Sequence, residues 1–389
     1  MKIETPDLDA LRRHRGRKWS RYEPDVLPAW IADMDFLPAP PIRATLLEAV
    51  HSGDLGYGPV AERTGIPESF SEWAQRRWQW RLDPEAVLLM PDVVGGLANC
   101  IEALSAPGDS ILVQTPIYPP FLSSVRNSFR RLVASPLIDG EIDFDALERA
   151  MVQEKVRMLL LCNPHNPTGR CFSGDELSRI AVLALEHRVL VVSDEVHADL
   201  VFAGHRHIAF ASLSPEVARI TVTLNAASKA FNLAGLRAAV CAVEDPELRR
   251  KLRALPAQRW TPFSTLGVRA SLAAWSDEGE QWLLACVAHL QRMRDGFIDQ
   301  LPIRCRGIRC VMPQAGYLAW LDCRDLGLAV EPADFFLEHA RVALSPGNEF
   351  GTPGHGHARL NFATSESILE QIVSRMAAAL RSSSRVNSS

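Results

Sequence analysis

Short apolar runs alternate with amphipathic segments from about residue 45 to about residue 280. The runs are rich in Val, Ile and Leu and too short for helices, so they predict buried strands. We expect these strands over 86–90, 110–115, 157–163, 188–195, 219–224 and 238–243. Before, between and after these runs are segments in which apolar residues recur every three or four positions. They predict helices over 44–53, 66–80, 95–105, 173–187, 246–256 and 277–301. The alternation predicts an α/β fold whose mostly parallel central sheet carries helices on both faces.

The pattern divides the chain into four parts. We expect an N-terminal arm over 1–45, rich in Pro, Arg and Trp, that contributes to a smaller domain. A large ligand-binding α/β domain follows over 46–285, and a small C-terminal α+β domain with an apolar run at 316–323 covers 286–380. The polar, Ser-rich segment 381–389 predicts a disordered tail.

Composition narrows the class of protein. Hydrophobic residues make up 47% of the 389 residues, enough for a large core, and the net charge of −4 gives no support for nucleic-acid or membrane binding. The apolar runs are too short to span a bilayer. The eight cysteines lack C-x-x-C pairs and are interpreted as reduced core residues. The first residues lack an apolar signal region, so we expect a cytoplasmic protein.

Polar side chains and the first backbone amides of a predicted helix gather where the predicted strands end. Ligands of such sheets bind beyond the carboxyl ends of the strands, so these positions predict one shared site. The positions are Val93, Val94, Gly95, Tyr118, Asn166, Asp194, His197, Ser228, Lys229 and Arg237.

Part of this set suits a ligand with a phosphate and a flat ring. The amides of Val93, Val94 and Gly95 begin a predicted helix, and a helix N-terminus favours an anion. Arg237 can pair with the phosphate through two hydrogen bonds. Tyr118 offers an aromatic face to the ring.

Asp194 and Lys229 define the rest of the ligand. A buried carboxylate would keep a pyridine nitrogen protonated, and a lone lysine in the apolar run 223–237 would bind an aldehyde. Pyridoxal 5′-phosphate combines these groups. Burial and the nearby Arg237 are expected to lower the pKa of Lys229 toward neutrality.

The motifs resemble a known family. NPHNPTGR, SDEVHADL and SKAFNLAGLR are similar to segments of the class I/II aminotransferases, which are fold-type I pyridoxal-phosphate enzymes. Motifs in order from about residue 28 to 365 resemble the cystathionine β-lyase, or C–S lyase, branch of that family. They are PAWIADMDF, GYGP, YPPF, NPHNPTG, DEVHADLVF, ASKAFNLAGL and SPGNEFGTPGHGHARLNFA.

The resemblance implies a role for each matching position. Lys229 resembles the lysine that binds the cofactor, Asp194 the aspartate facing the pyridine nitrogen, and Asn166 the asparagine on the ring hydroxyl. The resemblance also implies cofactor contacts from Tyr118, His197, Ser228 and, across a homodimer interface, Tyr57. It implies substrate contacts from Arg359, which would pair with the α-carboxylate, and from Ala32, Asp33, Tyr57, Tyr118 and Asn166.

Each position also has a purely structural interpretation. Asp194 could cap a helix, Asn166 could only form a turn, and His197 could make a structural hydrogen bond. Arg359 could be a charge at a strand edge. The H-x-H pairs His205/His207 and His355/His357 have a spacing that can bind metal, but no ligand partner is evident, so we expect no metal site.

The match departs from the branch at three places. Asp92 and Gly95 stand where a glycine and a proline are usual, and Ala226 replaces a serine that would contact the phosphate. Gly316 replaces a larger residue near the expected pocket. We therefore hypothesise a roomier pocket or a bulkier substrate than cystathionine.

The resemblance favours a C–S β-lyase that releases thiol, pyruvate and ammonia from an S-substituted L-cysteine. The same residues would serve an aminotransferase or a decarboxylating enzyme, which remain alternatives. A catalytically idle regulator that binds the cofactor is a third. We expect a homodimer with shared active sites and a small-molecule amino-acid substrate.

Overall fold

A seven-stranded sheet forms the centre of the computed structural model, which describes residues 3–261 and 263–386. Across the sheet the order is β2 (Val87–Met90), β8 (Ala239–Ala242), β7 (Thr221–Asn225), β6 (Leu190–Asp194), β5 (Val156–Cys162), β3 (Ser110–Thr115) and β4 (Arg131–Pro136). Strand β8 runs antiparallel to both neighbours, and the other pairs are parallel. The predicted mostly parallel sheet is confirmed.

Strand β4 is the one member of this sheet that the apolar pattern did not predict. It lies at the sheet edge, and its residues alternate between exposed and more buried positions. An edge strand with one exposed face has no continuous apolar run, so the criterion that located the central strands fails there.

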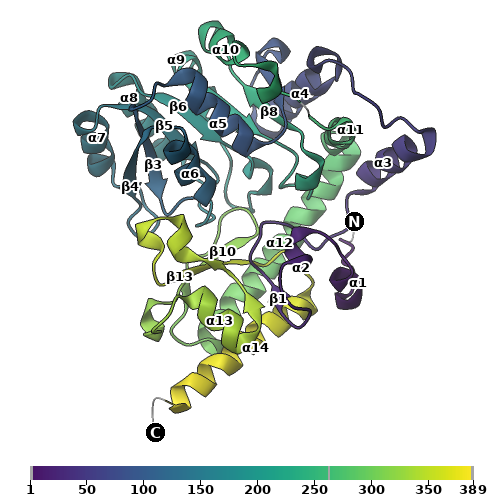
Figure 1. Cartoon of the computed structure of the whole chain (residues 1–389), viewed down its shortest axis with the longest axis vertical. Coiled ribbons are helices and arrows are strands. Elements are labelled where there is room, and N and C mark those ends of the chain that lie inside the picture. The colour runs from purple at the N-terminus through teal and green to yellow at the C-terminus, as the bar shows by residue number, and fades with distance from the viewer. Residues whose placement is uncertain (1–2, 262, 387–389) are drawn as a thin grey trace.

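Helices cover both faces of the sheet (Figure 1). Strand β5 shows why: Met158 and Leu160 enter one hydrophobic core, whereas Leu159 and Leu161 enter another, because successive side chains point to opposite faces. The first core also receives α5 (Val93–Leu104), α6 (Pro119–Asn127) and α10 (Pro246–Arg253). The second receives α7 (Phe144–Gln153), α8 (Gly174–Glu186) and α9 (Pro215–Arg219).

A third core continues from the large sheet into the C-terminal part of the chain. It contains residues of α3 (Pro40–Ser52), α4 (Ile66–Trp78), α11 (Thr265–Ala274), α12 (Asp277–Arg304), α13 (Pro332–Ala340) and α14 (Glu366–Val386). A smaller sheet lies here, in the order β12 (Ser345–Pro346), β13 (His357–Asn361), β10 (Leu318–Asp322) and β9 (Arg309–Cys310). In Figure 1 the long helix α12 runs from beside α11 to this C-terminal part.

The two ends of the chain differ from the sequence-based expectation. The first forty residues are not simply extended, since they contain α1 (Leu8–Arg12) and α2 (Arg17–Ser20). They also contain β1 (Leu27–Pro28), which pairs in parallel with β11 (Val342–Ala343) of the C-terminal part. Helix α14 continues to Val386, beyond the point where a disordered tail was expected to begin, and residues 387–389 lie outside the described residues. No helix in the described part of the chain has the length and apolar character needed to cross a membrane.

Candidate active site

The carboxyl edge of the large sheet brings four of the predicted residues together. Asp194 is the last residue of β6, and Lys229 lies in the turn that follows β7. Asn166 follows β5, and Tyr118 is the N-cap of α6, which follows β3. The four elements are adjacent parallel strands, so their ends meet at one edge.

Lys229 is partly buried, and its amine has no carboxylate within ion-pair distance among the described residues. Its Nζ donates a hydrogen bond to the Ala32 carbonyl at 3.1 Å. Desolvation lowers the pKa of Lys229, and the nearby Arg359 lowers this pKa further, whereas Asp33 opposes the change. The predicted effect of burial is confirmed, but the predicted effect of Arg237 is wrong, because Arg237 pairs with Asp92 and Arg359 is the cation that acts on Lys229.

The segment 30–33, which carries the predicted Ala32 and Asp33, has its carbonyl groups held by side chains. Asn361 Nδ2 donates to the carbonyls of residues 31 and 33, at 2.7 Å each. The Tyr317 hydroxyl donates to the Ala32 carbonyl at 3.0 Å. Lys18 Nζ donates to the residue 33 carbonyl at 3.0 Å. The segment is therefore a fixed wall of the site. Sequence reasoning missed Asn361, although it lies in a quoted motif, and Tyr317, which lies in the predicted apolar run 316–323.

Asp194 is buried and lies close enough to Lys229 for the charge of each group to act on the pKa of the other. Its Oδ1 accepts a hydrogen bond from the Val196 amide at 3.1 Å. Burial raises the pKa of Asp194 to about 7, although the Val196 amide and Lys229 both act to lower it. A cation placed against this carboxylate would restore its ionised form. The group therefore suits a ligand with a basic ring nitrogen.

Arg359 lies on β13, so it comes from the smaller sheet rather than from the large one. Its Nη1 donates to Asn166 Oδ1 at 2.9 Å, and its Nη2 donates to the Trp30 carbonyl at 3.0 Å and to Ser345 Oγ at 3.1 Å. Its Nε is buried and has no hydrogen-bond partner among the described residues. Burial lowers the pKa of Arg359 to about 10, so it is still a cation at neutral pH. A buried cation with an unused donor suits an anionic ligand group.

His197 is buried beside these groups. Its Nδ1 has no partner among the described residues, and its ring meets the Tyr317 ring edge-on at 6.3 Å. Burial, with Lys229 and Arg359, lowers the pKa of His197 to about 3, so the imidazole is neutral. Nδ1 therefore does not make the structural hydrogen bond that was the alternative interpretation of His197, within the described part of the chain.

Gly316 has a backbone reason to be glycine. Its φ is +80°, a conformation that L-residues rarely adopt, and a Cβ there would lie 3.9 Å from His197 Nδ1. The size of the pocket alone is therefore an incomplete explanation of this glycine, because the backbone itself favours glycine. A larger residue at this position would strain the turn even where space is available.

The predicted phosphate end lies at the N-terminus of α5. The amides of Val93 and Val94 begin this helix as expected. The Gly95 amide, however, donates to Asp92 Oδ1 at 2.7 Å, so the N-cap side chain already engages one of the three amides predicted to contact a phosphate. Arg237 Nη2 donates to the other oxygen, Asp92 Oδ2, at 2.6 Å.

Ser228, Tyr118 and Tyr57 differ in how far they are buried. Ser228 directly precedes Lys229 and is partly buried. Tyr118 is close enough to Arg359 and Asp194 for their charges to affect it, and burial raises its pKa. Tyr57 lies on the segment after α3 and is fully exposed, so the chain does not bring it into its own site.

The histidine pairs have partners of their own. His207 is buried and its Nε2 lies 2.9 Å from Glu195 Oε2, while His355 Nδ1 lies 2.8 Å from Glu331 Oε1. Within the described residues, the one grouping that could hold a metal ion is Glu148, Glu186 and His187. His187 is the C-cap of α8 and comes just before the first residue of β6. This grouping therefore lies at the amino ends of the parallel strands, whereas Lys229 lies at their carboxyl ends.

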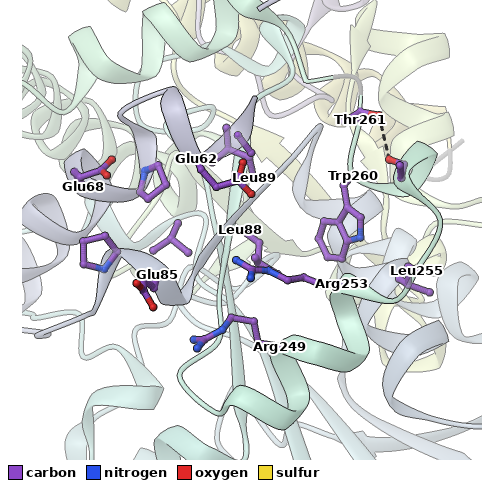
Figure 2. Close-up of a pocket in the computed structure, with 15 residues that line it drawn as sticks. Glu62, Glu68, Glu85, Leu88, Leu89, Arg249, Arg253, Leu255, Trp260 and Thr261 are labelled. Atoms are coloured by element: carbon purple, nitrogen blue, oxygen red, sulfur yellow. Dashed lines mark hydrogen bonds between the residues drawn. The ribbon is translucent and has the colours of Figure 1, made fainter. Parts of the chain in front are cut away.

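A cavity lies at the site, and a larger one lies apart from it. A narrow one is lined by Asn166, His197 and Gly316, among others. A cavity of about 910 Å³ lies elsewhere, between α4, the start of β2, α10 and the segment 257–261, as Figure 2 shows. None of the predicted site residues lines it, so it is separate from the Lys229 site.

The chain is similar to known proteins along most of its length. The family model described as aminotransferase class I and II matches residues 31–376. "Cystathionine beta-lyase PatB" of Bacillus subtilis is 36% identical over 92% of this chain and 93% of that protein. "Cystathionine beta-lyase" of Corynebacterium glutamicum is 33% identical over 96% and 99%. The solved structure of a PLP-bound C–S lyase from Staphylococcus hominis superposes with a TM-score of 0.89, at 29% identity over 97% of this chain and 98% of that one.

Proposed function

The chain belongs to the aminotransferase class I and II family, as its motifs predict, and from that premise we propose that it is a pyridoxal 5′-phosphate-dependent C–S β-lyase. With one molecule of water, it converts an S-substituted L-cysteine into a thiol, pyruvate and ammonia. Full-length similarity to proteins named cystathionine β-lyase supports the reaction. The observation that carries the proposal is the Lys229 amine, which is partly buried, has a lowered pKa and faces Asp194 and Arg359 in one site.

The residues present fit the cofactor. Asp194 would face the ring nitrogen, because its buried carboxylate gains most from a cationic partner. The Val93 and Val94 amides and Arg237 would hold the phosphate, with Ser228 beside them. Asn166, Tyr118 and the neutral His197 would line the ring. When bound, pyridoxal 5′-phosphate supplies a cationic conjugated ring that stabilises the electron pair left on the substrate Cα.

Lys229 would move the substrate proton. A base at this position must be neutral, and the lowered pKa of Lys229 increases the neutral fraction at physiological pH. The Ala32 carbonyl holds Nζ at 3.1 Å and so restricts where the amine points. Nζ would take the proton from Cα as the Cβ–S bond breaks and the thiolate leaves.

Arg359 would bind the α-carboxylate of the substrate. Its Nη2 is fixed by Trp30 and Ser345, and its Nε has no partner among the described residues. Fixing the carboxylate orients the bonds of Cα, which decides which of them breaks. Ala32 and Asp33 would form the neighbouring wall.

The active unit is a homodimer in this proposal. The exposed apolar side chains Leu47, Val50, Leu55, Tyr57 and Val60 lie on α3 and the segment after it, and we call them the α3 patch. Exposed apolar groups of this kind mark interaction surfaces. A second copy covering the patch would carry Tyr57 to the partner's phosphate site. All eight cysteines are free, which supports a reducing compartment such as the cytoplasm.

The proposal is tested with the purified holoenzyme and no added keto acid. Cystathionine or a bulky S-substituted cysteine should yield pyruvate and free thiol over many turnovers. Lys229→Ala should abolish both products, because no other amine would move the proton. Turnover that requires a keto acid would instead identify an aminotransferase. Bound cofactor without turnover of any amino acid would favour the regulator.

A further inference from the structure

The carboxylate of Asp92 lies at the N-terminus of α5, where the cofactor phosphate is predicted to bind. Asp92 Oδ1 accepts from the Gly95 amide at 2.7 Å, and Asp92 Oδ2 accepts from Arg237 Nη2 at 2.6 Å. The Asp92 side chain therefore binds two groups, the Gly95 amide and Arg237, that are predicted to contact the phosphate. Ala226, which stands where the resemblance would place a serine on the phosphate, has no hydroxyl to replace either of them.

The charges at this end oppose a second anion. The N-terminus of α5 carries a partial positive charge that favours one negative group, and Asp92 already supplies it. A phosphate monoester adds a charge of about −1.5 to −2 beside that carboxylate. Both partners of the Asp92–Arg237 pair are partly exposed, so solvent weakens the repulsion without removing it.

We propose that Asp92 competes with the cofactor phosphate for Arg237 and for the N-terminus of α5, and so lowers the affinity of the chain for pyridoxal 5′-phosphate. The inference rests on the proposed function. Binding requires Arg237 to turn from Asp92 toward the phosphate, or to be shared between them. Occupancy of the site then follows the concentration of free cofactor more closely than it would without this carboxylate.

Asp92→Asn isolates the charge. Asparagine is as good an N-cap as aspartate, so the cap of α5 and the fold are retained. Asp143 offers a matched control, because its side chain caps α7 in the same way, accepting from the Ala146 amide at 2.9 Å. Asp143→Asn removes a cap charge on a different helix.

The experiment titrates apoprotein with pyridoxal 5′-phosphate and, separately, with pyridoxal, which lacks the phosphate. Absorbance reports binding, and no substrate is present. We expect Asp92→Asn to tighten pyridoxal 5′-phosphate binding by about fivefold or more and to leave pyridoxal binding unchanged. Asp143→Asn should change neither. Inorganic phosphate should raise the thermal midpoint of Asp92→Asn apoprotein more than that of wild type.

Arg237→Gln, made alone and together with Asp92→Asn, forms a double-mutant cycle that tests the competition. It should weaken pyridoxal 5′-phosphate binding more in the Asp92→Asn background than in wild type, because Asp92 no longer competes for the guanidinium. Weaker or unchanged cofactor binding by Asp92→Asn would overturn the inference while leaving the proposed function intact. Absence of any binding at Lys229 in wild type would overturn both.

Discussion

Arg359 shows how single residues prepare this site for an anion. The guanidinium is buried, yet one of its N–H groups has no partner in the described part of the chain. A buried unpaired donor costs about 1–3 kcal/mol. A substrate carboxylate would supply the missing acceptor, so part of the binding energy is already prepared in the free protein.

We predict that Arg359→Lys lowers kcat/KM about 10- to 100-fold for amino-acid substrates. Lysine keeps the charge but loses the planar guanidinium that can donate two hydrogen bonds to one carboxylate. Steady-state kinetics on an S-substituted cysteine measures the loss. The α-methyl ester of the same compound is the control, because it lacks the charged carboxylate. An equal loss on acid and ester would contradict the assigned role.

At the scale of elements, a short 3₁₀ segment joins the site to the outer helices. Residues Ala198–Leu200 follow the predicted His197, and Asp199 in this segment accepts from Trp73 Nε1 of α4 at 3.1 Å. Arg77 of the same helix lies 3.5 Å from Asp199. Burial raises the pKa of Asp199 to about 6, although Arg77 and Trp73 act to lower it.

This raised pKa predicts a pH dependence of stability. The folded protein holds the Asp199 proton more tightly than the unfolded chain, so the stabilisation is complete below about pH 4 and is lost as pH rises through about 6. Asp199→Asn mimics the neutral form. The free energy of unfolding of the variant, relative to wild type, should therefore rise between pH 4 and 7 by up to about 3 kcal/mol.

Urea unfolding of the holoenzyme across this pH range measures the difference. Asp277→Asn is the matched control, because Asp277 pairs with Arg76 of the same helix at 3.0 Å but is largely exposed. Its difference from wild type should stay constant with pH. A constant difference for Asp199→Asn would show that the α4 contacts offset the desolvation of the carboxylate.

At the scale of the whole molecule, Tyr57 is the predicted site residue that the single chain does not use. It is fully exposed and lies in the α3 patch. If it serves the partner's site, each active centre combines Lys229 of one subunit with Tyr57 of the other. Isologous contacts would then form two such centres in each dimer.

Mixing two defective variants tests this arrangement. Lys229→Ala and Tyr57→Ala dimers should each be weak when the cofactor is limiting, but a mixed dimer contains one centre with neither change. After subunit exchange, about a quarter of wild-type activity should return, since half of the dimers are mixed and each has one intact centre. No recovery after verified exchange would place Tyr57 in its own chain's site or outside both.

Much of the sheet and part of the site follow from local sequence. Buried central strands have continuous apolar runs, and parallel strands all end at one edge, so Lys229, Asp194, Asn166 and Tyr118 had to meet there. The apolar pattern did not predict the edge strand β4, because one of its faces is exposed. The family and its cofactor also followed from the motifs.

The tertiary structure decided what each group contacts. Lys229 bonds to Ala32, which lies 197 positions earlier in the chain, and Arg359 reaches Asn166 from a different sheet. The Gly95 amide donates to the Asp92 side chain, and position 316 has a positive φ that favours glycine. Spacing along the chain determines which residues reach the same edge of a sheet. Hydrogen-bond partners, desolvation and backbone angles depend on distant segments that pack together, and these set the charge state of every group in the site.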